Sequence, residues 1–186
     1  MDKKIANSLG MALKRHDKGA VIALEIPYDI RLKANATSME LLSGMNYGGI
    51  YISFQTPFEA VLTDLTRHGL SIDKLVFLTC DEKSRGDPRC VLVPNRCGID
   101  ELIRAISTGI QRLKTSKKFI FIDSITTFSA SKHLAETLKF SEYLRRLVKE
   151  REIDVAILTF DSKDASLKKF IEDIAIHADE VLKLER

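Results

Sequence analysis

The sequence lacks any apolar run long enough to cross a membrane, which takes roughly 18 or more consecutive residues. The best candidate, residues 41–58, carries no charge but contains several polar side chains, three glycines and a proline. Residues 1–19 combine basic residues with a short apolar stretch, and no small-residue cleavage site follows them. They predict an amphipathic helix rather than a signal peptide, and we expect no association with a membrane.

Cysteine is scarce, and its positions form no motif. Cys80, Cys90 and Cys97 are an odd number, none forms a C-x-x-C pair, and their spacings match no common zinc pattern. We therefore expect structural thiols in a cytoplasmic protein, with no metal bound by the cysteines. The four histidines are also scattered, without the spacing of a catalytic triad or a metal site.

Charge of one sign is not concentrated strongly enough to define a function. The net charge is only +3, and a content of 45% hydrophobic and 30% charged residues is ordinary for a globular protein. Basic residues gather in two clusters, at 114–118 and 145–151. Such clusters are typical of solvated helix ends, and a nucleic-acid site is the alternative. The length of 186 residues predicts a single domain over 1–186.

Strand and helix patterns alternate along the chain. Short runs rich in β-branched and aromatic residues predict strands at 20–26, 50–54, 75–79, 90–94, 119–122, 155–160 and 178–184. Helical spacing and capping signals predict helices at 1–19, 38–45, 57–68, 99–113, 132–151 and 163–176. This alternation predicts a three-layer α/β fold, in which a mostly parallel sheet carries helices on both faces.

The most informative stretch is residues 117–128, which read KKFIFIDSITTF. Phe119 to Ile122 predict a strand buried on both faces, and Asp123 places a carboxylate at its carboxyl end. In phosphate-handling α/β folds, an acid at this position holds Mg²⁺. The stretch resembles a Walker B strand. Its continuation from Ile122 to Thr126, and the closing segment 178–184, resemble the KaiC branch of the RecA-like ATPases.

This resemblance implies a RecA-like P-loop NTPase core that covers the chain from about Ala20. It implies that Asp123 is the Mg²⁺ ligand, with Ser124 beside it, and that the protein assembles with other copies or relatives, as RecA-like domains commonly do. An aspartate at the end of a strand also serves as a helix cap or a hydrogen-bond acceptor in a loop, and this alternative stays open.

The phosphate loop that such a core requires is missing from the sequence. In the Walker A pattern, G-x-x-x-x-G-K-[ST], glycines allow successive backbone N–H groups to converge on the phosphates. After the first predicted strand the chain instead reads PYDIRLKANATSMELL, and no glycine stands between Gly19 and Gly44. The sequence therefore predicts a degenerate Walker A region.

The replacement segment has two interpretations. Arg31 and Lys33 carry positive charge that could form a divergent anion site. Alternatively, Thr37 and Glu40 form a capping box, in which the hydroxyl satisfies free N–H groups at the start of a helix over 38–45. The spacing of the hydroxyl and the carboxylate favours the capping box.

The catalytic glutamate is also replaced. In KaiC-like ATPases the end of the second strand resembles Y-[VI]-[ST]-F-E-E, and its glutamates activate the attacking water. Here Tyr51 to Thr56 read YISFQT, so Gln55 stands at the glutamate position. A glutamine orients a water but cannot take its proton. Thr56 itself reads as the N-cap of a helix that begins at Pro57.

Three functions are compatible with these patterns. The first is a non-catalytic RecA/KaiC-like protein that associates with itself or with an active relative. The second is an ATP-binding protein or ATPase that holds ATP and Mg²⁺ through Arg31, Lys33 and Asp123. The third is a nucleic-acid-binding accessory protein that uses the two basic clusters. The missing phosphate loop and catalytic base favour the first function, without a cofactor.

Overall fold

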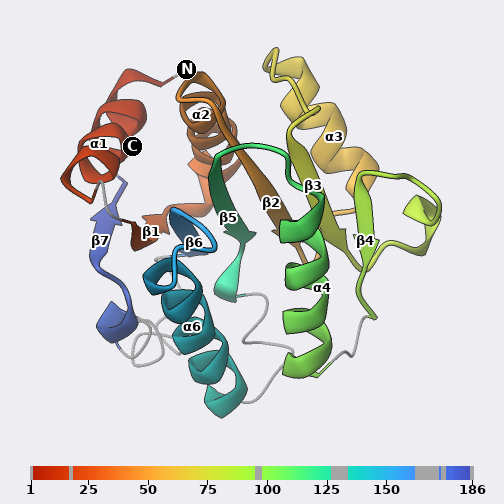
Figure 1. Cartoon of the computed structure of the whole chain (residues 1–186). Coiled ribbons are helices and arrows are strands. Elements are labelled where there is room, and N and C mark those ends of the chain that lie inside the picture. Colours follow the sequence, from red (N-terminus) through yellow and green to blue (C-terminus); the bar gives the residue numbers. More distant parts are fainter. Residues whose placement is uncertain are drawn as a thin grey trace.

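The computed structural model describes residues 2–16, 19–94, 98–126, 134–161, 172 and 175–184. Its centre is a seven-stranded sheet in the order β4-β3-β2-β5-β6-β1-β7, with parallel pairing throughout (Figure 1). The strands are β1 (Ala20–Ile26), β2 (Tyr47–Ser53), β3 (Leu75–Thr79), β4 (Cys90–Leu92), β5 (Lys117–Asp123), β6 (Val155–Asp161) and β7 (Glu180–Lys183). The helices are α1 (Lys3–Arg15), α2 (Arg31–Gly44), α3 (Phe58–Arg67), α4 (Ile99–Arg112) and α6 (Leu134–Lys149), with 3-10 turns η1 (Tyr28–Ile30) and η2 (Glu82–Ser84).

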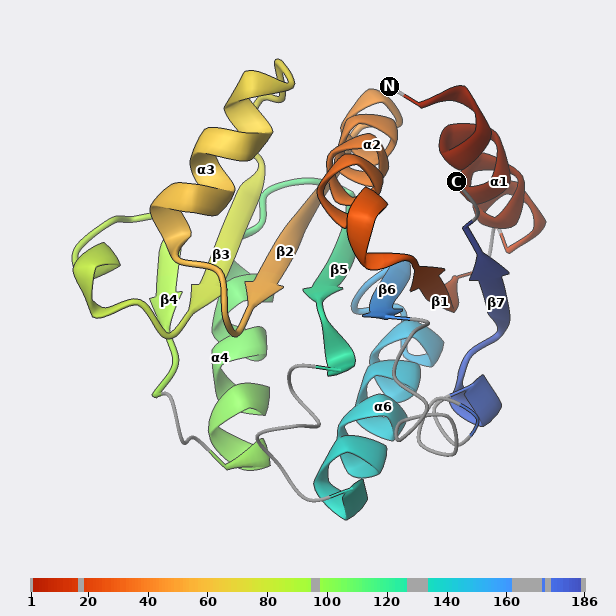
Figure 2. The ribbon, with the colours of Figure 1, turned by 180° about the vertical axis from the view of Figure 1, so that it is seen from behind.

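Helices cover both faces of the sheet and create two hydrophobic cores. Helices α1, α2 and α3 pack on one face, and α4 and α6 pack on the other (Figures 1 and 2). Alternate residues of a strand enter opposite cores. In β1, Val21 and Ala23 join the core under α4 and α6, whereas Ile22 and Leu24 join the other core. The predicted three-layer α/β fold is therefore confirmed.

Several predicted boundaries agree with the structure. The strands at 20–26 and 75–79 have the predicted bounds, and α4 ends one residue before the predicted position. The helix predicted over 163–176 lies largely outside the described residues, as do Cys97 and His133. None of the described helices is both long enough and apolar enough to span a membrane.

The predicted capping box at Thr37 is wrong. Helix α2 already begins at Arg31, and both Thr37 and Ser38 are buried inside it. Ser38 Oγ donates to the Ala34 carbonyl at 2.8 Å, and Thr37 Oγ1 accepts the Asp2 N–H at 3.2 Å. Because both hydroxyls form hydrogen bonds with other groups, neither of them caps the N-terminus of a helix. Helix α2 continues through this segment.

Two boundaries around β2 also differ from the prediction. Gly48 and Gly49 lie inside the strand rather than before it. Helix α3 starts at Phe58, and Thr56 is not its N-cap. Instead, Ser53 Oγ accepts the Thr56 N–H at 3.1 Å and donates to the Thr56 carbonyl at 3.0 Å. This short turn uses the polar groups of Thr56, so the helix begins later than the sequence signal indicates.

Glu180 connects the amino-terminal helix to the edge of the sheet. Its carboxylate pairs with the Arg15 guanidinium and lies 3.0 Å from His16 Nε2. Burial acts to raise the pKa of Glu180, but the hydrogen bonds and charges of Arg15 and His16 outweigh burial, so this pKa lies below its ordinary value of 4.5. The contact therefore stabilises the ionised carboxylate.

Acid should weaken this contact. A carboxyl group with a lowered folded-state pKa contributes stability above its unfolded pKa, near 4.5, and this contribution is lost as the pH falls below that value. We expect the unfolding free energy of the wild type to fall more than that of Glu180→Gln between about pH 5 and about pH 3. The difference should stay below about 1 kcal/mol, because the pair is close to solvent. Urea titrations that decline in parallel would contradict this expectation.

Candidate functional site

The carboxyl ends of the parallel strands form one edge of the sheet, the edge at which α/β proteins bind their ligands. Strand β5 ends there at Asp123, and β1 ends there at Ile26, followed by η1 and the start of α2. The two strands are separated by β6. Asp123 is only 6% exposed. The segment that follows β1 reaches this buried carboxylate, because Arg31 at the start of α2 lies beside Asp123.

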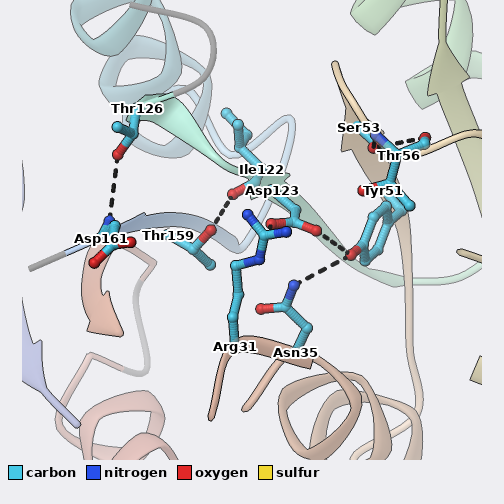
Figure 3. A network of polar contacts seen from close by, with 10 residues as sticks. All are labelled: Arg31, Asn35, Tyr51, Ser53, Thr56, Ile122, Asp123, Thr126, Thr159 and Asp161. Atoms are coloured by element: carbon cyan, nitrogen blue, oxygen red, sulfur yellow. Dashed lines mark hydrogen bonds and ion pairs between the residues drawn. The ribbon is translucent and has the colours of Figure 1, made fainter. Parts of the chain in front are cut away.

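Three side chains form a polar network with Asp123 (Figure 3). The Tyr51 hydroxyl donates to Asp123 Oδ2 at 3.0 Å, and Asn35 Nδ2 donates to the Tyr51 oxygen at 3.4 Å. Arg31 Nε lies 3.9 Å from Asp123 Oδ1. Burial raises the pKa of Tyr51 well above its ordinary value of 10.0, and the charge of Asp123 raises it further. Tyr51 therefore stays neutral and remains a hydrogen-bond donor.

A small cavity adjoins this network. It has a volume of about 20 Å³, and its walls include Asn35, Tyr51, Thr56 and Asp123. The Oδ1 atoms of Asn35 and Asp123 are buried and form no hydrogen bond with the described residues. A cavity of this size holds about one water molecule. Pockets that enclose a small-molecule ligand are far larger, at roughly 300–1,000 Å³.

Of the two cations predicted for an anion site, Arg31 lies beside Asp123 and Lys33 does not. Arg31 faces the carboxylate, whereas Lys33 Nζ pairs with Asp2 Oδ2 at 2.6 Å, next to the start of α1. Ser124 follows Asp123 through a cis peptide bond and is buried. Within the described ranges, no group of three or more His, Cys, Asp or Glu side chains is arranged to hold a metal ion.

Gln55 belongs to a different part of the same edge. It is exposed on the loop after β2 and lines a cavity of about 180 Å³ together with Ser53, Thr79 and Asp81. This cavity lies where β2 and β3 end, whereas the cavity beside Asp123 lies between α2, α3 and the sheet. The two predicted site positions, Gln55 and Asp123, therefore line separate cavities.

Sequence analysis does not identify Tyr51 or Asn35 as site residues, although both positions carry a signal. Ser53 pairs with Asp123 in the register of β2 and β5, and Tyr51 stands two residues earlier, on the same side of the sheet. Asn35 stands four residues after Arg31, on the same face of α2. Polar groups at such positions in apolar elements indicate a buried network. The sequence can assign these polar residues to one network only when the strand order is known.

Fold and site together define a class of protein. The chain has the RecA/KaiC-like fold, with a buried aspartate at the carboxyl end of a central parallel strand. Two solved structures from Pyrococcus horikoshii are similar to it. The uncharacterized protein PH0321, solved in complex with an unknown peptide, has a TM-score of 0.68 and 14% identity, over 94% of this chain and 82% of its own. The KaiC-like protein PH0186 has a TM-score of 0.58 and 16% identity, over 90% of this chain and 72% of its own.

These similarities establish the fold and leave the activity open. No protein-family model matches the sequence, and no curated protein matches it in sequence. At identities of 14% and 16%, related folds host different functions. The function must therefore be argued from the side chains at the site.

Proposed function

We propose that this protein is a non-catalytic RecA/KaiC-like protein that acts through association with other proteins. The observation that carries the proposal is the Arg31–Asp123 pair, in which a cation of the chain itself lies beside the carboxylate that the resemblance assigns to Mg²⁺. A buried carboxylate is strongly destabilising unless it is paired. Arg31 supplies a counter-charge from the chain itself, at the position where a nucleotide site would place the metal ion.

The segment between β1 and α2 further supports a site without a nucleotide. It forms the 3-10 turn η1, whose residues Tyr28, Asp29 and Ile30 all carry side chains where a Walker A loop uses glycine. The Arg31 guanidinium carbon lies 5.4 Å from the centre of the Tyr28 ring, so a cation–π contact also holds this side chain. With a cavity of about 20 Å³ beside Asp123, these residues do not fit Mg²⁺ and a triphosphate. Gln55 supplies no catalytic base.

Two observations favour a protein partner. Tyr28 and Leu32 remain 66% and 58% exposed on either side of Arg31, and tyrosine and arginine are enriched at binding hot spots. The similar protein PH0321 was solved with a peptide. We infer that the partner is a second copy or an active relative of the same fold. The buried thiol of Cys90, which forms no disulfide, accords with a reducing, cytoplasmic location.

Calorimetric titration with ATP and Mg²⁺ tests this proposal. We expect no binding heat and no rise in melting temperature in excess ATP, because a ligand of the native state would raise that temperature by mass action. Light scattering on the same samples over a concentration series reports self-association. Asp123→Asn is the matched variant, because asparagine keeps an acceptor for Tyr51 and loses the charge. Wild-type binding that this variant loses would contradict the proposal and indicate a divergent ATP site.

A further inference from the structure

A groove is lined by side chains of α4 and α6. These two helices cover the face of the sheet opposite to α1, α2 and α3 (Figure 1). The volume of the groove is about 660 Å³. The groove is open to solvent rather than enclosed. Helix α4 contributes Ile103, and α6 contributes Lys139, Glu142, Tyr143, Arg145, Arg146 and Lys149. The groove therefore combines an apolar wall with a row of charged side chains.

The charge of the groove is strongly one-sided. Four of its side chains are cations and only Glu142 is an anion. Among the described residues, no carboxylate lies within ion-pair distance of any of the four cations. Arginines elsewhere in the chain, such as Arg15, Arg85 and Arg89, are each paired with a carboxylate. The cations of the groove are thus available to an anionic partner.

One of these cations is held in place before any partner arrives. The Arg146 guanidinium carbon lies 5.5 Å from the centre of the Tyr143 ring, which is itself stacked on Phe140 at 6.5 Å. Tyr143 is only 7% exposed, so its ring is a fixed support. A side chain that is already ordered loses less conformational entropy on binding. Arg146 is therefore suited to anchor a carboxylate.

We propose that this groove binds an acidic segment of a partner protein. The proposal deepens the proposed function, on which it rests, by naming the chemistry of the partner. From Lys139 to Lys149 the cations extend over about 15 Å of helix. This span accommodates roughly four or five residues of an extended chain. Glutamates of such a segment would meet the cations, and its apolar side chains would meet Ile103.

Nucleic acid fits the groove less well. Proteins that bind single strands offer exposed aromatic rings on which bases stack. The ring of Tyr143 is buried and lies under Arg146. Glu142 also lines the groove and would repel phosphates. A peptide with both carboxylates and apolar side chains matches this mixed lining better.

Fluorescence anisotropy with a labelled peptide of alternating glutamate and leucine tests the proposal. The glutamine counterpart of the peptide and a short single-stranded oligonucleotide serve as competing probes. The groove variant is Arg146→Glu/Lys149→Glu, and the matched control is Lys14→Glu/Arg67→Glu, which reverses two exposed cations on α1 and α3. We expect the groove variant to lose at least about tenfold in affinity for the glutamate peptide, and the control to lose less than about twofold.

Three results would overturn the proposal. The first is equal binding of the glutamate peptide and its glutamine counterpart. The second is an equal loss of affinity in the groove and control variants, which would show a general charge effect. The third is tighter binding of the oligonucleotide that only the groove variant loses, which would assign the groove to nucleic acid. Melting curves confirm that each variant is folded. The ATP titration is independent of this groove, so the proposed function can fail or succeed separately.

Discussion

Replacing Arg31 by methionine should lower the free energy of unfolding by about 2 kcal/mol, because it leaves the buried Asp123 carboxylate without a counter-charge. Loss of one partner from a fully buried pair costs roughly 3–5 kcal/mol. Arg31 is 27% exposed at its side chain and lies 3.9 Å from Oδ1, so a smaller cost is expected. Urea denaturation of the two proteins measures this difference.

The companion substitution should behave differently. Asp123→Asn removes the buried charge but keeps an acceptor for the Tyr51 hydroxyl, so we expect a change below about 1 kcal/mol. The double variant Arg31→Met/Asp123→Asn should then be nearly as stable as Asp123→Asn alone, giving a coupling energy of about 2 kcal/mol. Additive effects in this cycle would show that Arg31 does not compensate the charge of Asp123. The structural account of the site would then be wrong.

Gly49→Ala should lower the free energy of unfolding by about 3 kcal/mol, at the upper end of what overpacking a core costs. Gly49 lies in β2 and pairs with Phe119 of β5. A Cβ atom at Gly49 would lie within 2.5 Å of three ring carbons of Phe119, which is itself 1% exposed. The cavity that Phe119 borders has a volume of only about 10 Å³, which is too small to receive a displaced ring. The measurement is the urea midpoint of the purified variant.

Gly44→Ala is the matched control, because a Cβ atom there meets no other atom within 4 Å. Gly44 ends helix α2, and alanine is the better helix former, so we expect a change of no more than about 0.5 kcal/mol, in the stabilising direction. Combining Gly49→Ala with Phe119→Leu should recover part of the lost stability, since leucine removes the ring carbons in contact. A Gly49→Ala variant as stable as the wild type would contradict the packing of β2 against β5.

The functional consequence of the Arg31–Asp123 pair depends on whether a metal ion or a side chain of the protein compensates the charge of Asp123. In a nucleotide site, Asp123 would be stabilised by a bound metal ion, and the free protein would carry an uncompensated charge. Here Arg31, Tyr51 and Asn35 already surround the carboxylate. The charge of Asp123 is thus compensated within the chain by Arg31, and one of its two carboxylate oxygens accepts a hydrogen bond from Tyr51. This is the physical basis of our proposal that the protein keeps the architecture and acts through partners.

Local patterns predict much of this fold. Residues 20–24 and 119–122 are apolar on both sides because their strands are buried between two helical layers, and that pattern is visible without coordinates. The lack of glycine after β1 is equally visible. By contrast, Thr37 and Thr56 resemble helix caps in the sequence, yet their polar groups bond to Asp2 and Ser53. A capping signal cannot show which other group competes for the same hydroxyl or amide.

The sequence alone therefore determined the alternation of strands and helices, the buried strand that ends at Asp123 and the absence of a glycine-rich phosphate loop. These features are local, because each depends on neighbouring residues along the chain. Only the tertiary structure decided that Arg31 faces Asp123, that the ring of Phe119 covers Gly49, and that the cations of α6 share a groove with Ile103. Each of these contacts joins elements far apart in the chain, and strand order and helix packing determine which elements meet.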